Sequence, residues 1–420
     1  MEKTGSRILP RFYPLIAFVI PVAVIVFLWL MAHGSFQKNE NEDYFVFYLP
    51  VAQNIVHGNG ITLNGKLAAE YPPGYPVLLA GVLFAAQILH IDQEVLFRVS
   101  IALYLAISAL LIYFCARVLW NPCQAFWASV LWSSYPLIMW ASKQQNSELP
   151  FMPFLYGALL CFLVSWRAAK NKEWYFFFGG ILCGAAMLIR PIAIGIGLII
   201  AVLMLFWKRY RFSKRVVFAL LIIGGNLVII LPWEMWMWRQ THEVHLLCRT
   251  RDTNSMFDGL TFAVWNPEGY RKGVAVPADV KKFMEETIPK YFSIHSTGQI
   301  IALVTEQLKT HPGTMIKLLC IKAARSWYGT NSNRLESLIL AVQGFYFILM
   351  ALACWKFWKT RADCRLPLAI GLLLLVYFWA MTISVLSIVR YMVPVLGLMF
   401  IFFPALKPSR VFSLRRYLKE

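Results

Sequence analysis

The chain has 420 residues, of which 59% are hydrophobic and 15% aromatic, and its formal net charge is +19. A water-soluble surface is difficult to assemble from this composition, so we expect an integral membrane protein. The Lys and Arg residues fall in short clusters between apolar runs, which argues against nucleic-acid binding and favours topology signals and contacts with lipid headgroups.

A bilayer's hydrocarbon core requires about 20 apolar residues in a spanning helix. Runs of this kind predict ten spans in an all-α polytopic membrane protein. A further uncharged run at 74–90 follows the polar loop after the first span. The ten predicted spans are 12–32, 98–118, 124–142, 149–167, 175–189, 192–207, 216–236, 337–356, 366–388 and 391–406.

The basic clusters indicate how these spans are oriented, because positive loops are retained in the cytoplasm. Ten spans place every cluster on that side. An eleventh crossing at 74–90 would put the cluster at 208–215 and the C-terminal tail outside, so we predict that 74–90 is a re-entrant or interfacial helix and that both termini are cytoplasmic. The clusters are Lys3/Arg7/Arg11, Arg167/Lys170/Lys172, Lys208/Arg209/Arg211/Lys214/Arg215, Lys356/Lys359/Arg361/Arg365 and Lys407/Arg410/Arg415/Arg416/Lys419.

This topology predicts three parts of the chain. Residues 1–236 form a transmembrane catalytic module of seven helices that includes the first outer loop at 33–97. Residues 237–336 form an outer loop region, and residues 337–420 hold the C-terminal helices and a basic cytoplasmic tail. The first outer loop, the turn at 143–148 and the outer loop region then share one side of the membrane, where we expect the reaction centre.

The eight cysteines show no CxxC pair and no spacing typical of a zinc site. Only Cys248 and Cys320 fall in the outer loop region, where an oxidising compartment permits a disulfide, and the sequence alone leaves that pairing open. The chain also has no P-loop, which counts against a nucleotide-driven pump.

Short motifs recur along the chain, beginning with Asn41-Glu42-Asp43-Tyr44 and Tyr71-Pro72-Pro73-Gly74-Tyr75-Pro76 in the first outer loop. Together they resemble membrane glycosyltransferases of the GT-C class, in the branch of the protein O-mannosyltransferases and the lipid A aminoarabinose transferases. The further matching pieces are Pro50–Asn54, His57–Gly60, Asn146–Pro150, Leu188–Pro191, Leu231–Trp233 with Arg239, His311–Pro312 and Arg390–Tyr391.

The resemblance implies transfer of a sugar from a polyprenyl-phosphate carrier to an acceptor on the outer side of the membrane. It implies that Asp43 is the general base, with Glu42 as its neighbour, and that Glu148 is the second acidic position. The chemistry agrees, because a hydroxyl must lose its proton as it attacks an anomeric carbon, and a carboxylate takes that proton. The departing lipid phosphate needs fixed cations, and Arg190 and Arg390 are the best candidates.

Each assignment has a structural alternative. Glu42 and Asp43 are also explained as solvated loop residues, and Glu148 as an anion at the start of a helix. Arg190 and Arg390 stand at span boundaries, where arginine side chains extend to lipid headgroups. Weaker candidates for contact with the phosphate or substrate are Lys143, Arg239, Tyr71, Arg98, Lys322 and Arg325.

Two other functional classes stay open: a glycan ligase or polymerase that uses polyprenyl-linked sugars, and a flippase for lipid-linked sugars. Few charges inside spans and no internal repeat count against transport. A divalent cation, Mg²⁺ or Mn²⁺, is compatible with the acidic positions but is not required by them. The sugar and the acceptor, whether glycan, lipid or protein, are undetermined. The length and the lack of a retrieval signal favour a bacterial inner membrane, with a periplasmic active site.

Overall fold

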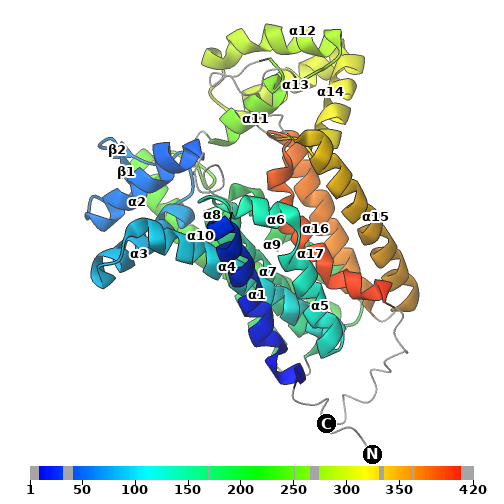
Figure 1. The fold of residues 1–420 in the computed structure, drawn as a ribbon. Helices are drawn as coiled ribbons and strands as arrows, with labels where there is room; N and C mark the ends of the chain where they lie inside the picture. The colour runs from blue at the N-terminus through cyan, green and yellow to red at the C-terminus, as the bar shows by residue number, and fades with distance from the viewer. Residues whose placement is uncertain are drawn as a thin grey trace, which may run out of the picture.

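The computed structural model describes residues 9–31, 41–168, 171–249, 251–264, 274–330, 335–361 and 364–407. The described chain is almost entirely helical. Within it, the strands are β1 (Thr62–Leu63) and β2 (Lys66–Leu67), which form one short antiparallel hairpin. A bundle of long helices carries a smaller group of helices at one end (Figure 1).

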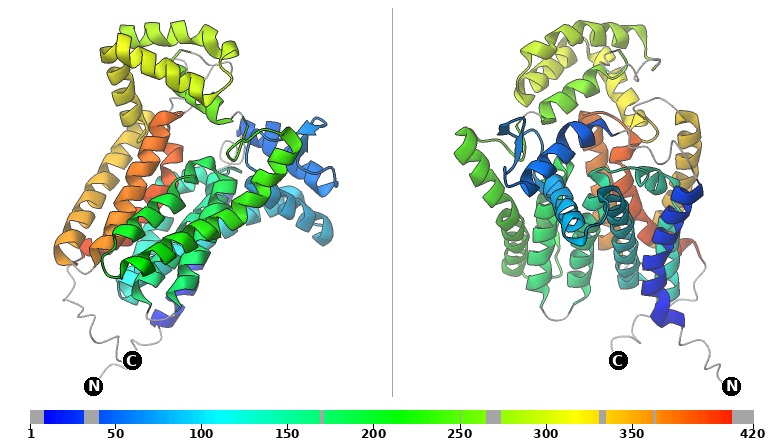
Figure 2. Two further views of the ribbon diagram at one scale, coloured as in Figure 1. Left: turned by 180° about the vertical axis from the view of Figure 1, so that it is seen from behind. Right: turned by 60° about the vertical axis from the view of Figure 1, so that its left-hand side comes forward.

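Seven described helices are long and apolar enough to cross a membrane, which confirms the predicted polytopic all-α class. They run alongside one another in the bundle (Figure 2). The seven are α1 (Leu9–Met31), α4 (Gln93–Leu119), α7 (Glu148–Arg167), α8 (Lys172–Ile189), α10 (Phe212–Thr241), α15 (Glu336–Thr360) and α16 (Arg365–Ser384).

The other three predicted spans are interrupted helices. In the predicted span 124–142, Pro136 begins the second of two helices. At the start of the predicted span 192–207, Pro191 follows Arg190. The residue before a proline is driven out of helical geometry. Length alone does not decide whether such segments cross, so the count of ten stays a prediction. The segments are α5 (Pro122–Ser133) with α6 (Pro136–Ala141), η3 (Pro191–Ala193) with α9 (Ile196–Phe206), and η6 (Val389–Tyr391) with α17 (Val393–Met399) and η7 (Phe400–Leu406).

The first outer loop folds into η2 (Tyr44–Tyr48), α2 (Leu49–Val56), the hairpin and α3 (Gly74–Leu89). The 16 residues of α3 span about 24 Å, less than the roughly 30 Å of a hydrocarbon core. In Figure 1, α2 and α3 project to one side of the long helices. The prediction that 74–90 is re-entrant or interfacial stays untested.

A second group of helices forms from the predicted outer loop region: α11 (Arg251–Thr261), α12 (Ala278–Thr287), η4 (Ile288–Ser293), α13 (Thr297–Thr310) and α14 (Pro312–Arg325). We call α11–α14 the outer helices. They share an apolar cluster that also takes in Leu386 and Ile388, from the segment after α16. The segment before Arg390 is therefore packed against the outer helices. The three-part division of the chain stays a prediction.

The start of α1 and the end of η7 lie at the end of the bundle opposite the outer helices (Figure 1). This arrangement is compatible with the predicted topology, whose orientation stays a prediction. The basic residues of the predicted topology clusters at 1–8, 169–170 and 408–420 lie outside the described residues.

Helices α8 and α10 approach each other closely because glycines face backbone atoms of the partner helix. A Cβ atom at Gly180 would meet the Ile222 carbonyl oxygen, and one at Gly225 would meet the Phe177 carbonyl oxygen. Small residues allow such contact between helices within a membrane. These contacts hold the first half of α8 against α10.

Candidate active site

Glu148 is the first residue of α7 and only 1% of its surface is exposed. The Asn146 Oδ1 accepts a hydrogen bond from the Leu149 N–H at 3.2 Å, so a side chain other than Glu148 already caps the first turn. A buried carboxylate is costly without cationic partners. Its counter-charges come from neighbouring elements of the fold.

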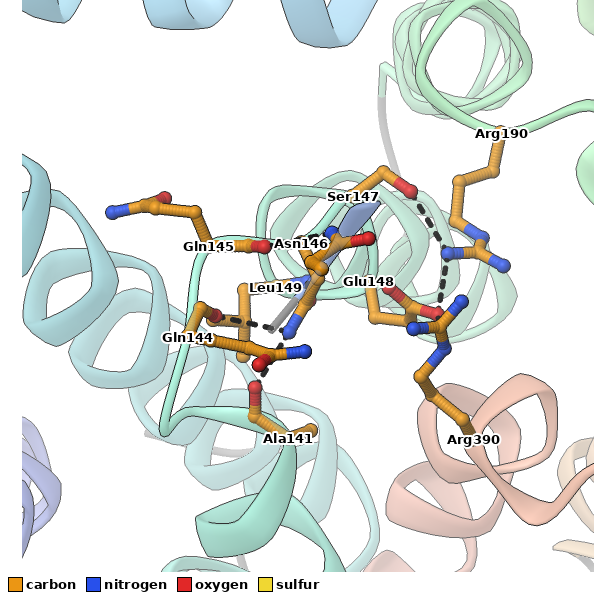
Figure 3. Close-up of polar contacts among 10 residues, drawn as sticks. Ala141, Gln144, Gln145, Asn146, Ser147, Glu148, Leu149, Arg190 and Arg390 are labelled. Atoms are coloured by element: carbon orange, nitrogen blue, oxygen red, sulfur yellow. Dashed lines mark hydrogen bonds and ion pairs between the residues drawn. The ribbon is translucent and has the colours of Figure 1, made fainter. Parts of the chain in front are cut away.

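Two arginines contact the same oxygen of Glu148. The Nη1 of Arg190 and the Nε of Arg390 each lie 2.8 Å from Glu148 Oε1. Arg190 Nη1 also donates to Ser147 Oγ at 2.9 Å. Figure 3 shows the two guanidinium groups converging on the carboxylate from different elements. The single negative charge of Glu148 thus faces the two positive charges of the arginines.

Tyr391 packs against both arginines. The guanidinium carbon of Arg190 lies 5.2 Å from the centre of the Tyr391 ring, and that of Arg390 lies 5.7 Å from it. Such cation–π contacts orient a guanidinium without consuming its N–H donors. In the described part of the chain, Arg190 forms its ion pair only through Nη1 and Arg390 only through Nε. Each side chain therefore has N–H groups beyond the one in its ion pair.

Asp43 comes to this cluster from the first outer loop. The Tyr71 hydroxyl donates to Asp43 Oδ1 at 2.7 Å, and the Tyr71 ring packs against those of Phe47 and Tyr48, with centroids 4.5 and 4.9 Å away. Packing and hydrogen bond together fix the position of a half-buried carboxylate.

An electrostatic effect links Asp43 to the arginines. Burial acts to lower the pKa of Arg390, but the negative charges of Glu148 and, more weakly, Asp43 raise it above its ordinary value. Arg390 is therefore held in its charged form. Asp43, Glu148, Arg190 and Arg390, four residues from distant parts of the sequence, belong to one charged cluster.

The remaining predicted site residues lie differently. Glu42 is exposed beside Asp43, and Lys143 is half-buried in the turn before Glu148. Arg239 is exposed near the end of α10, and in the described chain no ion pair joins it to the cluster. The weaker candidate Arg325 pairs instead with Glu336, through two contacts of 2.9 and 3.0 Å.

Several residues of the site were missed by the sequence reasoning. Asn41 Nδ2 donates to the Gln145 carbonyl oxygen at 2.9 Å, and Gln145 Nε2 donates to the Phe97 carbonyl oxygen at 2.7 Å. These bonds tie the first outer loop to the turn before α7. Asn41, Ser147 and Tyr391 stand within the matched motifs, so the motifs carried a signal for them that the residue chemistry alone did not.

The cysteines and the acidic groups bear on the two open questions of cross-linking and metal. Cys248 is buried and Cys320 exposed, and no disulfide joins these two described residues. Across the described ranges, no group of three or more His, Cys, Asp and Glu residues has a geometry that could hold a metal ion.

Comparisons with known proteins concern the family and the fold of the chain. Residues 71–236 match the family of dolichyl-phosphate-mannose-protein mannosyltransferases. A search of curated proteins finds no match. The archaeal oligosaccharyltransferase AglB from Archaeoglobus fulgidus, solved with an inhibitory peptide and a dolichol-phosphate, has a similar structure, with a TM-score of 0.57 at 14% identity. That similarity covers 94% of this chain and 50% of AglB.

The same archaeal enzyme in its apo form has a TM-score of 0.57 at 15% identity and covers 100% of this chain and 52% of the enzyme. ArnT from Cupriavidus metallidurans, bound to undecaprenyl phosphate, has a TM-score of 0.45 at 16% identity, with 91% of this chain and 77% of ArnT covered. This chain spans about half the length of the oligosaccharyltransferase. In the segment 71–236, which matches the mannosyltransferase family, and in its fold, the chain resembles the membrane glycosyltransferases of the GT-C class, as its motifs predicted.

Proposed function

We propose that the chain is a glycosyltransferase that moves a sugar from a polyprenyl-phosphate carrier to an acceptor at the outer face of the membrane. One observation carries the proposal: Arg190 and Arg390 share a single oxygen of Glu148 beside Asp43. The matched mannosyltransferase family and the dolichol-phosphate bound to AglB support this class of donor.

The arginines are suited to bind the phosphate of the carrier. A phosphate accepts several charge-assisted hydrogen bonds, and an arginine presents donors in a planar fork. Arg190 and Arg390 hold N–H groups beyond those that contact Glu148, and both are largely shielded from water. As the bond to the sugar breaks, negative charge grows on the phosphate oxygens, where these fixed cations stabilise it most.

Asp43 is suited to act as the general base. Its carboxylate takes the proton of the acceptor hydroxyl while the acceptor oxygen forms a bond with the anomeric carbon. The bond between that carbon and the phosphate oxygen breaks, and the electron pair leaves on the polyprenyl phosphate. The hydrogen bond from Tyr71 holds Asp43 in one orientation. The phosphate leaves as a stable anion, so no acid need protonate it. Glu42, the exposed neighbour of Asp43, stays a second candidate for the general base.

Glu148 serves in this scheme as the residue that holds the arginines together. Two guanidinium groups this close repel each other unless an anion lies between them. Glu148 supplies that anion when no lipid is bound, and the remaining positive charge attracts the phosphate. The proposed role of Glu148 is therefore electrostatic and positional rather than that of a proton acceptor.

The side of the membrane on which the site lies is inferred from the predicted topology. The cluster includes the first outer loop, and the segment of Arg390 contacts the outer helices. The positive-inside rule assigns these elements to the non-cytoplasmic face. We propose a bacterial inner membrane with the site facing the periplasm.

A glycan ligase or polymerase would use the same phosphate site, and differs in the size of the transferred glycan. A flippase would move the carrier without breaking its bond to the sugar. The two carboxylates also leave room for a divalent cation, Mg²⁺ or Mn²⁺. The acceptor, whether protein, lipid or glycan, is not assigned.

The lipid that copurifies with the chain tests the donor class. We expect mass spectrometry of extracts from the purified protein to find polyprenyl phosphate, with or without a sugar. The double variant Arg190→Gln/Arg390→Gln, purified in parallel, should retain much less. If the unmodified chain retains none and does not bind added polyprenyl phosphate, the proposal is wrong. Release of free polyprenyl phosphate from a loaded donor separates transfer from flipping.

A further inference from the structure

The backbone directly before Arg190 is in contact with the first outer loop. Gly74 begins α3, and a Cβ atom there would lie 2.5 Å from the Leu188 carbonyl oxygen and 2.8 Å from the Ile189 nitrogen. Real Cβ atoms do not approach backbone atoms so closely. Only glycine at position 74 allows α3 to lie against the last turn of α8, where Arg190 follows.

The backbone before Arg390 is held in a comparable way from the outer helices. Gly329 lies beyond the end of α14, and a Cβ atom there would lie 2.8 Å from the Arg325 carbonyl oxygen of its own segment and 2.9 Å from the Ser387 carbonyl oxygen. The Val389 N–H donates to the Gly329 carbonyl oxygen at 2.9 Å. The residue next to Arg390 is thus hydrogen-bonded to the end of an outer helix.

A third glycine strengthens that second contact. Gly259 belongs to α11, and a Cβ atom there would meet the Val385 carbonyl oxygen and lie 2.7 Å from the Nζ of Lys322. Helix α11 and the residues after α14 therefore both contact the segment 385–389. Leu386 and Ile388 of the same segment are buried in the apolar cluster of the outer helices.

Neither arginine stands inside a long helix. Arg190 is the residue after α8 and has an extended backbone, with φ −143° and ψ 121°. Arg390 lies in η6, a single turn of three residues. A residue at a helix end is not fixed by a hydrogen-bonded turn on both sides, so its position depends on what packs against it. Here the packing partners are Gly74 and Gly329.

We propose that Gly74 and Gly329 are positioning residues, through which the first outer loop and the outer helices set the spacing of Arg190 and Arg390 around a lipid phosphate. The inference rests on the proposed function, because it assumes that the arginines bind phosphate. Substrate contacts on α3 or on the outer helices then alter how tightly the carrier is held.

Alanine at either position separates two backbone segments. Neither glycine has a positive φ, so the backbone angle does not exclude alanine, and the effect comes from the close contacts of the added methyl group, which at Gly329 include the Arg325 carbonyl oxygen of its own segment. Backbone atoms yield less readily than the end of a flexible side chain, and the added methyl group must shift the arginine-bearing segment. Bidentate binding of a phosphate depends on the relative placement of the donors, so we expect weaker binding.

The chain provides matched controls. Gly81 on α3 and Gly313 on α14 have open space where a Cβ would be added, with nothing within 4 Å. Gly225 on α10 is as tightly packed as Gly74, but its contacts are at Phe177 and Ile181, in the middle of α8. Gly81→Ala and Gly313→Ala control for the substitution, and Gly225→Ala controls for general destabilisation.

The experiment measures the affinity of each purified variant for a short-chain polyprenyl phosphate in detergent, together with thermal stability and, where transfer is assayed, the donor KM and kcat. We expect Gly74→Ala and Gly329→Ala to bind roughly three- to tenfold more weakly than the unmodified chain, with the loss mainly in KM. Gly81→Ala, Gly313→Ala and Gly225→Ala should bind normally, although Gly225→Ala should also be less stable.

The unmodified chain supplies a second measurement if an alanine variant fails to fold. Phosphate binding should slow hydrogen exchange at the Val389 amide, which bonds to Gly329, and at the first amides of α3. Equal affinity in Gly74→Ala, Gly329→Ala and their controls, or unchanged exchange at both places, would overturn the inference alone. Failure of the unmodified chain to bind the lipid would instead overturn the proposed function, and this inference with it.

Discussion

Arg190 and Arg390 each lie 2.8 Å from the same oxygen of Glu148, although they belong to elements that are far apart in the sequence. A carboxylate shared in this way neutralises only one of two cations. We propose that the arginines also bind a further anion, the phosphate of the carrier, and most of our predictions depend on this arrangement.

Removal of the shared carboxylate should make the fold dependent on phosphate. In Glu148→Gln, the two buried arginines lose their counter-charge, which costs about 3–5 kcal/mol when a buried pair is broken. We expect a lower thermal midpoint and a larger rise of that midpoint with added polyprenyl phosphate than in the unmodified chain, because a ligand stabilises the state that it binds.

The ion pair between Arg325 and Glu336 provides the control for that prediction. Glu336→Gln also breaks a shielded ion pair and should lower the thermal midpoint, but added polyprenyl phosphate should raise it no more than in the unmodified chain. An equal response of Glu148→Gln and Glu336→Gln to the lipid would contradict the assignment.

The two arginines should contribute separately to lipid affinity. Arg190→Gln and Arg390→Gln each remove a charge-assisted contact, worth about 1.5–3 kcal/mol for a hydrogen bond to a charged group, so binding of polyprenyl phosphate should weaken by one to two orders of magnitude, roughly. Arg249→Gln, in an exposed arginine outside the cluster, should bind normally. Binding measurements in detergent check this, and normal affinity in Arg190→Gln would return that residue to a headgroup contact.

Tyr71→Phe should lower kcat more than it weakens lipid binding. The variant keeps the packing against Phe47 and Tyr48 but loses the hydroxyl that donates to Asp43. A base without its orienting partner samples unproductive positions, and we expect a loss of about tenfold, equivalent to about 1.4 kcal/mol. Steady-state kinetics with saturating donor measures it, and an unchanged kcat would show that the hydrogen bond does not matter for transfer.

We predict that the stability of the outer helices depends on pH because Lys322 is buried among them. It is 2% exposed, and burial lowers its pKa to about 7, from about 10.5. Between these values the unfolded chain binds a proton that the folded chain does not, so the stability should rise as the pH increases from about 7 to about 10.5, and the full penalty should be present below about 7.

Lys322→Met tests that pH dependence. The variant should be more stable than the unmodified chain at pH 7 and below, by up to a few kcal/mol, roughly, and the difference should shrink as the pH rises. Hydrogen exchange in α11 and α14, followed in both proteins as the pH rises, measures this difference in stability. A difference that stays constant with pH would show that protonation of Lys322 is not the cause.

The sequence predicted much of the fold because long apolar helices leave a direct pattern. The sequence was less informative where helices are broken. The runs at 124–142, 192–207 and 391–406 carry no charged residue, and only the prolines within them or directly before them indicate that the backbone changes direction. Tyr135 precedes one such proline and Arg190 another, and both take extended geometry.

The sequence pointed to the members of the candidate site, whose roles stay a prediction, but not to the contacts between them. Motifs and charge pointed to Asp43, Glu148, Arg190 and Arg390, and the topology placed them on one side of the membrane. That both arginines would share one oxygen is a property of tertiary packing, which no periodicity encodes. The same holds for Gly74, whose importance depends on what lies opposite it.

The transfer reaction of Asp43→Asn tests the central claim most directly. Asparagine keeps the size of the side chain and still accepts the Tyr71 hydrogen bond, but it cannot take a proton. With polyprenyl-phosphate-linked sugar in reconstituted membranes, we expect transfer to fall by about 10²- to 10⁴-fold, while polyprenyl phosphate binding and thermal stability stay near those of the unmodified chain. Glu94→Gln, in an exposed acidic residue on α4, should transfer normally. Near-normal transfer by Asp43→Asn would contradict the account.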